Sequence, residues 1–232
     1  MILKEKIKSI QPNDYVLEVG PGARPYPRSD IYLDKKFETD KIALSQRGNS
    51  PEVAFQKPVF YYDGRRFPFK DKEFDYVICS HVLEHVPIEE LHQFISEFQR
   101  VAGKGYIEFP LVFYEFINYT NAHSWFINYR SGEILLLNKT IFPSNYIHKA
   151  FREFFYGDKY IYRAFKKYKE FFFAGFEWTG EIKYKIVDDF NTLINQDDFN
   201  YWQNYFKEVS QNINNRNWLK RIIYKMAMKF LD

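Results

Sequence analysis

Short apolar runs, each closed by polar or turn-forming residues, recur along the first half of the chain. Tyr15, Val16, Leu17 and Val19 form the first run, whose β-branched content is typical of a strand buried on both faces of a parallel sheet. Four further runs predict strands at residues 31–33, 59–62, 75–80 and 105–109. With the helices between them, these strands predict one α/β domain, which fits a chain of 232 residues.

Apolar residues at helical spacing predict the helices. Residues 1–10 predict a short amphipathic helix that covers the sheet and ends at residues 11–14. Residues 35–58 are polar and predict a loop or a weak helix. Pro87 is expected to start a helix that ends near Gly103, because apolar residues then recur every three or four positions.

The pattern changes after residue 110. The expected elements are a hairpin at 126–139 turning at 130–133, a helix at 144–169 capped by Ser144, strands at 171–173 and 176–187, and a helical segment at 188–232. Gly175 and Gly180 are predicted to mark turns. We therefore divide the chain into a first half at 1–110, a lid or insertion with closing strands at 111–187, and a helical extension at 188–232.

The glycines that follow the first strand are the first candidate for chemistry. Gly20 and Gly22 allow positive φ and close approach of a ligand, and they lie at the carboxyl end of a strand, where open α/β sheets bind ligands. Taken alone, they are equally consistent with a plain tight turn. Asp34 ends the second strand. A nicotinamide fingerprint is disfavoured, because Pro25 stands where its third glycine belongs.

Two segments carry a family resemblance. The first is YVLEVGPGARPYPRSDIYLD at 15–34, with Glu18 two residues before the first glycine, and the second is DGRRFPFKDKEFDYVICSHVLEHVP at 63–87. Both are similar to class I S-adenosylmethionine-dependent methyltransferases of the type 11 kind, in the branch with a short first crossover. The resemblance implies a Rossmann-like, mostly parallel sheet with an antiparallel closing strand, flanked by helices, here with an aromatic-rich hairpin and helical insertion and a C-terminal helix.

The resemblance also implies the cofactor, S-adenosylmethionine, and its contacts. Glu18, Gly20 and Gly22 would surround the methionine moiety, Asp34 the ribose hydroxyls and Asp63 the adenine amine, while Phe67 would face the purine or brace the loop. Arg24 replaces a glycine that many members have, and it can supply a charged donor. The expected cofactor-binding set is Glu18, Gly20, Gly22, Arg24, Asp34, Asp63, Gly64, Phe67, Ser80 and His81.

Three histidines are candidates for catalysis. His81 and His85 follow the fourth strand with Glu84, where the transferable methyl group is expected, although a turn and helix packing explain this triplet equally well. His123 follows the fifth strand, and a histidine is the usual base for a hydroxyl, but a structural hydrogen bond is the commoner role. Tyr114, Glu84 and Trp125 are candidates for acceptor binding. No metal site is expected, because the two histidines and the glutamate after the fourth strand lack a further ligand.

Composition narrows the setting. The single Cys79 excludes a disulfide framework and, within an apolar run, predicts inert packing. No segment approaches the length of a transmembrane helix, so we expect a cytoplasmic protein. The net charge of +3 conceals a basic second half, in which residues 111–232 carry 17 Lys and Arg against 13 Asp and Glu. A basic amphipathic helix near the C-terminus can contact a membrane surface, but the commoner case is packing on its own domain.

The acceptor is the open question. All four tryptophans and 32 of the 48 aromatic residues lie after residue 110, which suits stacking on a sugar, as does the short-crossover resemblance to polysaccharide-cluster enzymes. We expect O-methylation of a sugar or surface-glycan precursor. A small-molecule, lipid-linked or phosphate-type acceptor is the alternative, and a non-catalytic cofactor-binding partner module is the alternative from another class. Nucleic acid is not expected, since no motif for reading it is present. The sequence leaves the oligomeric state open.

Overall fold

The computed structural model describes residues 1–37, 39, 57–142, 146–157 and 165–214. The chain divides into two compact units, Met1–Leu193 and Ile194–Asp232. The described part of the second unit is helix α8 (Gln196–Asn214). Ser144 and the basic segment at 216–230 lie outside the described residues, as does most of the predicted loop at 35–58.

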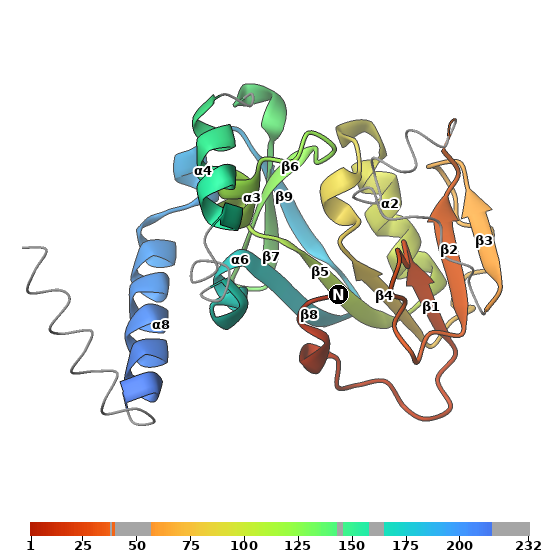
Figure 1. The fold of residues 1–232 in the computed structure, drawn as a ribbon. Helices are drawn as coiled ribbons and strands as arrows, with labels where there is room; N and C mark the ends of the chain where they lie inside the picture. Colours follow the sequence, from red (N-terminus) through yellow and green to blue (C-terminus); the bar gives the residue numbers. More distant parts are fainter. Residues whose placement is uncertain (38, 40–56, 143–145, 158–164, 215–232) are drawn as a thin grey trace, which may run out of the picture. The chain divides into compact units, whose positions relative to one another are not determined.

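A six-stranded sheet forms the centre of the first unit (Figure 1). Its strands are β1 (Val16–Val19), β2 (Ile31–Lys35), β3 (Val59–Tyr62), β4 (Tyr76–Ser80), β5 (Lys104–Pro110) and β8 (Phe173–Thr179). They run in the order β3-β2-β1-β4-β5-β8, and only β8 is antiparallel to its neighbour. The five predicted parallel strands and the antiparallel closing strand are thus confirmed, and the order reverses beside β1, where such sheets bind ligands.

A smaller sheet carries the insertion. Strands β6 (Trp125–Arg130) and β7 (Glu133–Asn138) form the predicted hairpin, with Ser131 and Gly132 at positive φ in its turn. Strand β9 (Lys183–Val187) pairs parallel to β7. The ring of Tyr129 on β6 stacks on Phe176 of β8 at 4.2 Å between centroids, so this hairpin packs against the closing strand of the main sheet.

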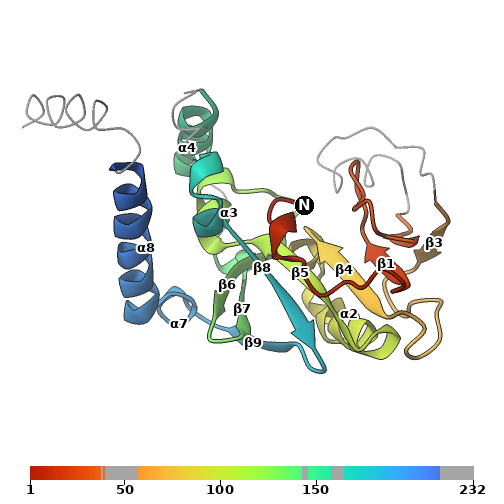
Figure 2. The same cartoon turned by 90° about the horizontal axis from the view of Figure 1, so that it is seen from below.

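Helices and short turns join these strands, and Figure 2 shows α2 on one side of the main sheet. They are η2 (Leu83–His85), α2 (Ile88–Val101), α3 (Val112–Asn118), η3 (Lys139–Ile141), α4 (Tyr146–Gly157), α6 (Lys169–Phe172) and α7 (Phe190–Leu193). The helix expected after Pro87 is confirmed as α2, whose buried side chains follow the predicted spacing. Within the described residues, no helix combines the length and the apolar character needed to span a bilayer.

The first ten residues do not form the predicted helix. They contain one 3-10 turn, η1 (Lys4–Lys6), and are otherwise extended. Two carboxylates of the sheet hold this segment: Ile2 and Leu3 donate to Glu108 at 2.7 and 2.8 Å, and Lys8 and Ser9 donate to Glu177 at 3.0 and 2.8 Å. The bonds to Glu177 take N–H groups that would otherwise be paired within a helix. The expectation that this segment covers the sheet is confirmed, because Met1, Ile7 and Ile10 pack against buried residues of β1, β4 and β5.

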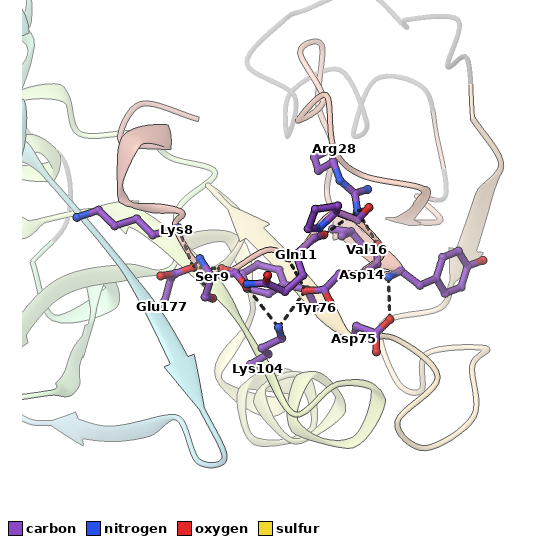
Figure 3. Close-up of polar contacts among 12 residues, drawn as sticks. Lys8, Ser9, Gln11, Asp14, Val16, Arg28, Asp75, Tyr76, Lys104 and Glu177 are labelled. Carbon is purple, nitrogen blue, oxygen red and sulfur yellow. Dashed lines mark hydrogen bonds and ion pairs between the residues drawn. The ribbon is translucent and has the colours of Figure 1, made fainter.

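Charged side chains hold the next residues against the amino ends of the strands (Figure 3). The guanidinium of Arg28 donates to three carbonyl oxygens between Gln11 and Asp14, at 2.7–3.1 Å. The Lys104 ammonium pairs with Asp14 at 2.9 Å, and Asp75 accepts from the backbone N–H of Tyr15. This network leaves the carboxyl ends of the strands as the edge at which a ligand can be bound.

The predicted break at Gly175 is wrong. Phe171 belongs to α6, and β8 runs without interruption from Phe173 to Thr179. A Cβ at Gly175 would lie 2.2 Å from the hydroxyl of Tyr106, so the glycine makes room for a neighbouring side chain and does not mark a turn. Gly180 does turn the chain, with φ at +76°. The strand that follows joins the smaller sheet as β9, so only β8 closes the main sheet.

Cys79 lies in the middle of the main sheet on β4 and is fully buried. Burial raises the pKa of its thiol well above the usual range, which keeps the group protonated and weakly nucleophilic. The predicted packing role is therefore the one its surroundings support.

Candidate active site

The glycine turn after β1 has the conformation that its residues predict. Gly20 and Gly22 have φ of +64° and +55°, in the region that favours glycine. A Cβ at Gly20 would lie 2.3 Å from a methyl carbon of Val82, so the turn packs closely on the segment that follows β4. A Cβ at Gly22 would meet nothing within 4 Å. The turn is thus fixed on one side and open on the other, as a loop that receives a ligand must be.

Glu18 is buried at the end of β1, with 3% of its surface exposed. Its carboxylate accepts from the Ser29 hydroxyl and the Tyr26 backbone N–H, both at 2.8 Å. Burial raises the pKa of Glu18 to about 7, although these two hydrogen bonds work in the opposite direction. In this structure Glu18 therefore ties the crossover segment to β1, and one of its oxygens, Oε2, accepts both bonds.

Two acids follow the next strands at the same edge. Asp34 is buried near the end of β2, and its carboxylate accepts from the Lys35 backbone N–H at 2.9 Å. Asp63 follows β3, is exposed, and accepts from the Arg65 backbone N–H. Gly64 has φ of +92°, and a Cβ there would lie 2.9 Å from the carboxylate of Glu90. The parallel order β3-β2-β1 places these groups in a row beside the glycine turn.

Phe67 does not face this row. Its ring is 1% exposed and packs edge-on against Tyr62, Phe94 and Phe98. Its backbone N–H donates to Glu97 at 2.7 Å. Of the two roles expected for Phe67, this packing favours bracing the loop over contact with a purine. Arg24, by contrast, is exposed in the crossover.

A buried ion-pair network lies where β4 ends. His81 has φ of +58°, and its ring lies between two buried carboxylates, with Nδ1 3.2 Å from Glu84 and Nε2 3.0 Å from Glu108. The second contact is poorly aligned for a hydrogen bond and is best described as an ion pair. Burial alone would lower the pKa of His81, but the two carboxylates raise it to about 9. His81 thus carries a proton at neutral pH and is unsuited to accept one. The Ser80 hydroxyl donates to Glu108 at 2.9 Å.

The backbone of η2 is joined to the start of β6, which brings His123 to the residues after β4. The Ser124 N–H donates to the Glu84 carbonyl at 2.7 Å, and the Trp125 indole N–H donates to the Val86 carbonyl at 2.6 Å. The rings of His85 and His123 meet edge-to-face, with 4.5 Å between their centroids. One ligand atom from each of Glu84, His85 and His123 lies within 4.8 Å of the others.

His123 is held in place from behind. Its Nδ1 lies 2.5 Å from a carboxylate oxygen of Glu115 on α3, and the other oxygen of that carboxylate pairs with the buried Lys139 at 2.5 Å. Burial would raise the pKa of Glu115, but the hydrogen bond and charge of His123 and Lys139 lower it. The Nδ1 atom of His123 must therefore carry the hydrogen, which leaves Nε2 as the acceptor in the neutral ring.

The proposed acceptor-binding residues differ in their surroundings. Glu84 is 1% exposed within the histidine cluster. Tyr114 is partly buried on α3, with its ring centroid 4.9 Å from that of Phe173. Trp125 is 1% exposed and its indole N–H is bonded to a carbonyl, so its position is that of a packing residue that orients η2.

Sequence reasoning missed three residues of this site: Glu108, Glu115 and Lys139. Glu108 lies inside a strand and Glu115 inside a helix, and no spacing distinguishes them from surface acids. One signal was present for Glu108, because an acid within an otherwise apolar strand must be paired when it is buried. The sequence argument against a metal also did not anticipate that His123 would join Glu84 and His85.

Comparison with known proteins supports the family resemblance. Residues 33–107 match the family described as "Methyltransferase domain", a match that includes Asp34, Asp63 and the β4 segment but begins after the glycine turn. The match is to a methyltransferase domain, covers 75 of the 232 residues and implies S-adenosylmethionine as the cofactor. No curated protein sequence matches the chain.

Partial likenesses to solved structures accompany that match. A protein of Pyrococcus horikoshii OT3 is 22% identical, with 44% of this chain and 52% of that chain covered and a TM-score of 0.33. A structure described as a putative methyltransferase of Bacillus halodurans C-125 is 21% identical, with 53% and 61% covered and a TM-score of 0.36. The chain thus spans between half and two thirds of the length of these two structures.

The residues present fit the implied cofactor. The open side of Gly22 leaves room beside the turn, and the acids Glu18, Asp34 and Asp63 follow one another along the carboxyl edge. Carboxylates are the acceptors that ribose hydroxyls and an adenine amine require. Glu18 accepts from Ser29 and from the Tyr26 backbone, while Asp34 and Asp63 each accept from the backbone N–H of a residue that follows them.

Proposed function

We propose that this chain is a cytoplasmic S-adenosylmethionine-dependent methyltransferase that acts on a hydroxyl group of a sugar or surface-glycan precursor. The position of Asp34 supports the assignment as a methyltransferase. Asp34 lies beside the glycine turn, where the order of the strands reverses, and inside the segment that matches a methyltransferase domain. The sugar acceptor is supported by the aromatic-rich second half of the chain.

The chain's own residues have three tasks in this reaction. Asp34 and Asp63 orient the cofactor, which supplies an electrophilic methyl group when bound. The acceptor site would be lined by the segment from His81 to His85 and by the start of β6. This segment lies next to the glycine turn, because Val82 packs on Gly20. Alignment of acceptor and donor in a site without water can lower the activation free energy by on the order of 7–11 kcal/mol.

His123 is the residue to which we assign the acceptor's proton. Glu115 fixes its Nδ1–H, so Nε2 has the free electron pair that a hydroxyl proton needs. His85 is the second candidate, because burial lowers the pKa of its ring and keeps it neutral. His81 is the least suited of the three, because the carboxylates of Glu84 and Glu108 raise its pKa to about 9 and so favour its protonated form.

Cofactor binding is tested by thermal unfolding. S-adenosylhomocysteine at a hundredfold excess over Kd is expected to stabilise the fold by about 2.7 kcal/mol, which raises Tm by several degrees for a chain of this size. NAD at the same concentration is expected to leave Tm unchanged. A shift with NAD and none with S-adenosylhomocysteine would reverse the assignment of the glycine turn. Turnover of labelled cofactor with a panel of acceptors then separates an enzyme from a binding module and a sugar from other acceptors.

The two acids are tested by calorimetric titration. Asp34→Ala removes a charged acceptor for two ribose hydroxyls and is expected to weaken S-adenosylhomocysteine binding by about 1.5–3 kcal/mol. Asp63→Ala is expected to cost less, because a single amine bond is lost. Asp71→Ala, which removes a well-exposed acid on the neighbouring loop, is the matched control. Unchanged affinity in the Asp34 variant would remove Asp34 from the cofactor site.

A further inference from the structure

We propose that Glu84, His85 and His123 bind a divalent transition-metal ion of the zinc type, which holds the oxygen of the acceptor. Two imidazoles and one carboxylate are the protein ligands of many catalytic zinc sites, which keep a further position open for water or substrate. The three ligand atoms lie within 4.8 Å of one another. Tetrahedral zinc, with bonds of about 2.1 Å, needs about 3.4 Å between ligands, so small side-chain rotations close the site.

Both histidines are prepared as ligands by the groups behind them. The Nδ1 atom of His85 faces the Ala122 carbonyl at 3.1 Å, and that of His123 faces the Glu115 carboxylate at 2.5 Å. An acceptor at Nδ1 requires the hydrogen to be there, which leaves both Nε2 atoms as the electron-pair donors. A carboxylate or carbonyl behind each ligating imidazole is the usual arrangement around metal ions.

Glu84 supplies a second, independent indication. Its side chain is 1% exposed, yet Oε2 has no hydrogen-bond partner among the described residues, while Oε1 pairs with His81. A buried carboxylate oxygen without a partner is costly, and a bound cation removes that cost.

The chemical role of the ion rests on the proposed function. A cation beside the glycine turn would bind the acceptor's hydroxyl and lower its pKa, so that the proton passes to water and the oxygen is already charged when it meets the methyl group. His123 would then act as a ligand and not as the base. This arrangement selects acceptors that offer a hydroxyl able to bind a metal, and a neighbouring oxygen on the same sugar would strengthen that binding.

Metal binding is measured on the full-length protein without reference to turnover. Protein treated with a chelator and freed of it is titrated with Co²⁺, whose visible absorption reports coordination, and with Zn²⁺ by calorimetry. We expect one equivalent of either ion to bind. Glu84→Gln and His123→Gln are each expected to weaken binding by 100-fold or more, and Glu115→Gln by roughly 10–100-fold, the usual effect of a group behind a ligand.

The control is His92→Gln, which changes an exposed histidine on α2 that bonds to the Tyr184 hydroxyl. It is expected to bind both ions as the unmodified protein does. Absence of the Co²⁺ spectrum in the unmodified protein, or an unchanged affinity in folded Glu84→Gln and His123→Gln variants, would overturn the proposal. S-adenosylhomocysteine binding is measured in parallel on metal-free protein. If the protein binds the metal but not S-adenosylhomocysteine, the methyltransferase function alone is wrong. If it binds S-adenosylhomocysteine but not the metal, the metal site alone is wrong.

Discussion

Replacement of His123 by alanine is expected to lower kcat for methyl transfer by roughly 10²–10⁴-fold and to leave S-adenosylhomocysteine affinity unchanged. The residue lies just before the smaller sheet, and the contacts of its ring that the structure describes are with Glu115 and His85. Loss of its ring therefore removes either the base that takes the proton or a ligand of the proposed metal ion. Neither change touches the groups assigned to the cofactor.

The measurement uses labelled S-adenosylmethionine and an acceptor found by screening, with kcat and KM determined separately. His92→Ala is the matched control, because His92 is exposed and is bonded only to the Tyr184 hydroxyl among the contacts that the structure describes. His85→Ala is expected to lower turnover and, because it lies closer to the turn through η2, also to weaken cofactor binding. Near-normal turnover in all of the His81, His85 and His123 variants would show that positioning alone drives the reaction, or that the acceptor oxygen is already ionised.

The second large effect is expected on stability, from Glu108→Ala. Glu108 is fully buried and accepts from the backbone of Ile2 and Leu3 and from the hydroxyls of Ser80 and Tyr106, while it pairs with His81. Its removal takes one of two carboxylates from the partly buried His81 ring, and it takes the acceptor from two backbone N–H groups and the Ser80 hydroxyl. Such a loss typically costs about 3–5 kcal/mol. The free energy of unfolding in urea measures it.

Glu177→Ala is the control for this variant. Glu177 also holds the amino-terminal segment, through Lys8 and Ser9, but it is only half-buried and faces no imidazolium. We expect its replacement to cost about 1–2 kcal/mol, clearly less than Glu108→Ala. Equal losses in the two variants would show that anchoring the segment, and not the charge pair with His81, is what Glu108 contributes.

The same residue predicts how stability depends on pH. Burial would raise the pKa of Glu108, but the hydrogen bond and charge of His81 and the two backbone N–H groups lower it from 4.5 to about 2. Because the folded value lies below the unfolded one, the stabilisation is complete above about pH 4.5 and is lost as the pH falls toward 2. It amounts to about 3 kcal/mol. Urea unfolding of the unmodified protein between pH 6 and pH 3 is expected to show about 2 kcal/mol of this loss, and Glu108→Gln is expected to reduce it.

Local patterns were sufficient where an element depends on its own residues. The five parallel strands follow from short apolar runs, α2 from its helical spacing after Pro87, and the β6–β7 hairpin from the turn at Ser131 and Gly132. The positive φ of Gly20 and Gly22 and the position of Asp34 near the end of the second strand follow in the same way. These features need no knowledge of distant residues, because backbone sterics and burial periodicity decide them.

Distant partners decided the rest. The first ten residues have a helical pattern, but Glu177 takes the N–H groups of Lys8 and Ser9 that a helix would use, and Glu108 holds Ile2 and Leu3 against the sheet. Both acids lie about a hundred or more positions away. Gly175 has the composition of a turn, but its missing Cβ admits the hydroxyl of Tyr106 within a continuous strand. In both places a tertiary contact outweighed the local preference.

By itself, the sequence determined the parallel strands, the glycine turn and the acids that indicate a methyl-donor cofactor. These are local motifs at fixed spacing. Only the tertiary structure decided which charged groups surround each histidine. His81 lies between Glu84 and Glu108, and the two carboxylates favour its protonated form. The hydrogen bond between η2 and the residue before β6 brings His123 next to His85, although 38 positions separate them. Buried charges act over a few ångströms, and which charges come that close is settled by packing and not by spacing along the chain.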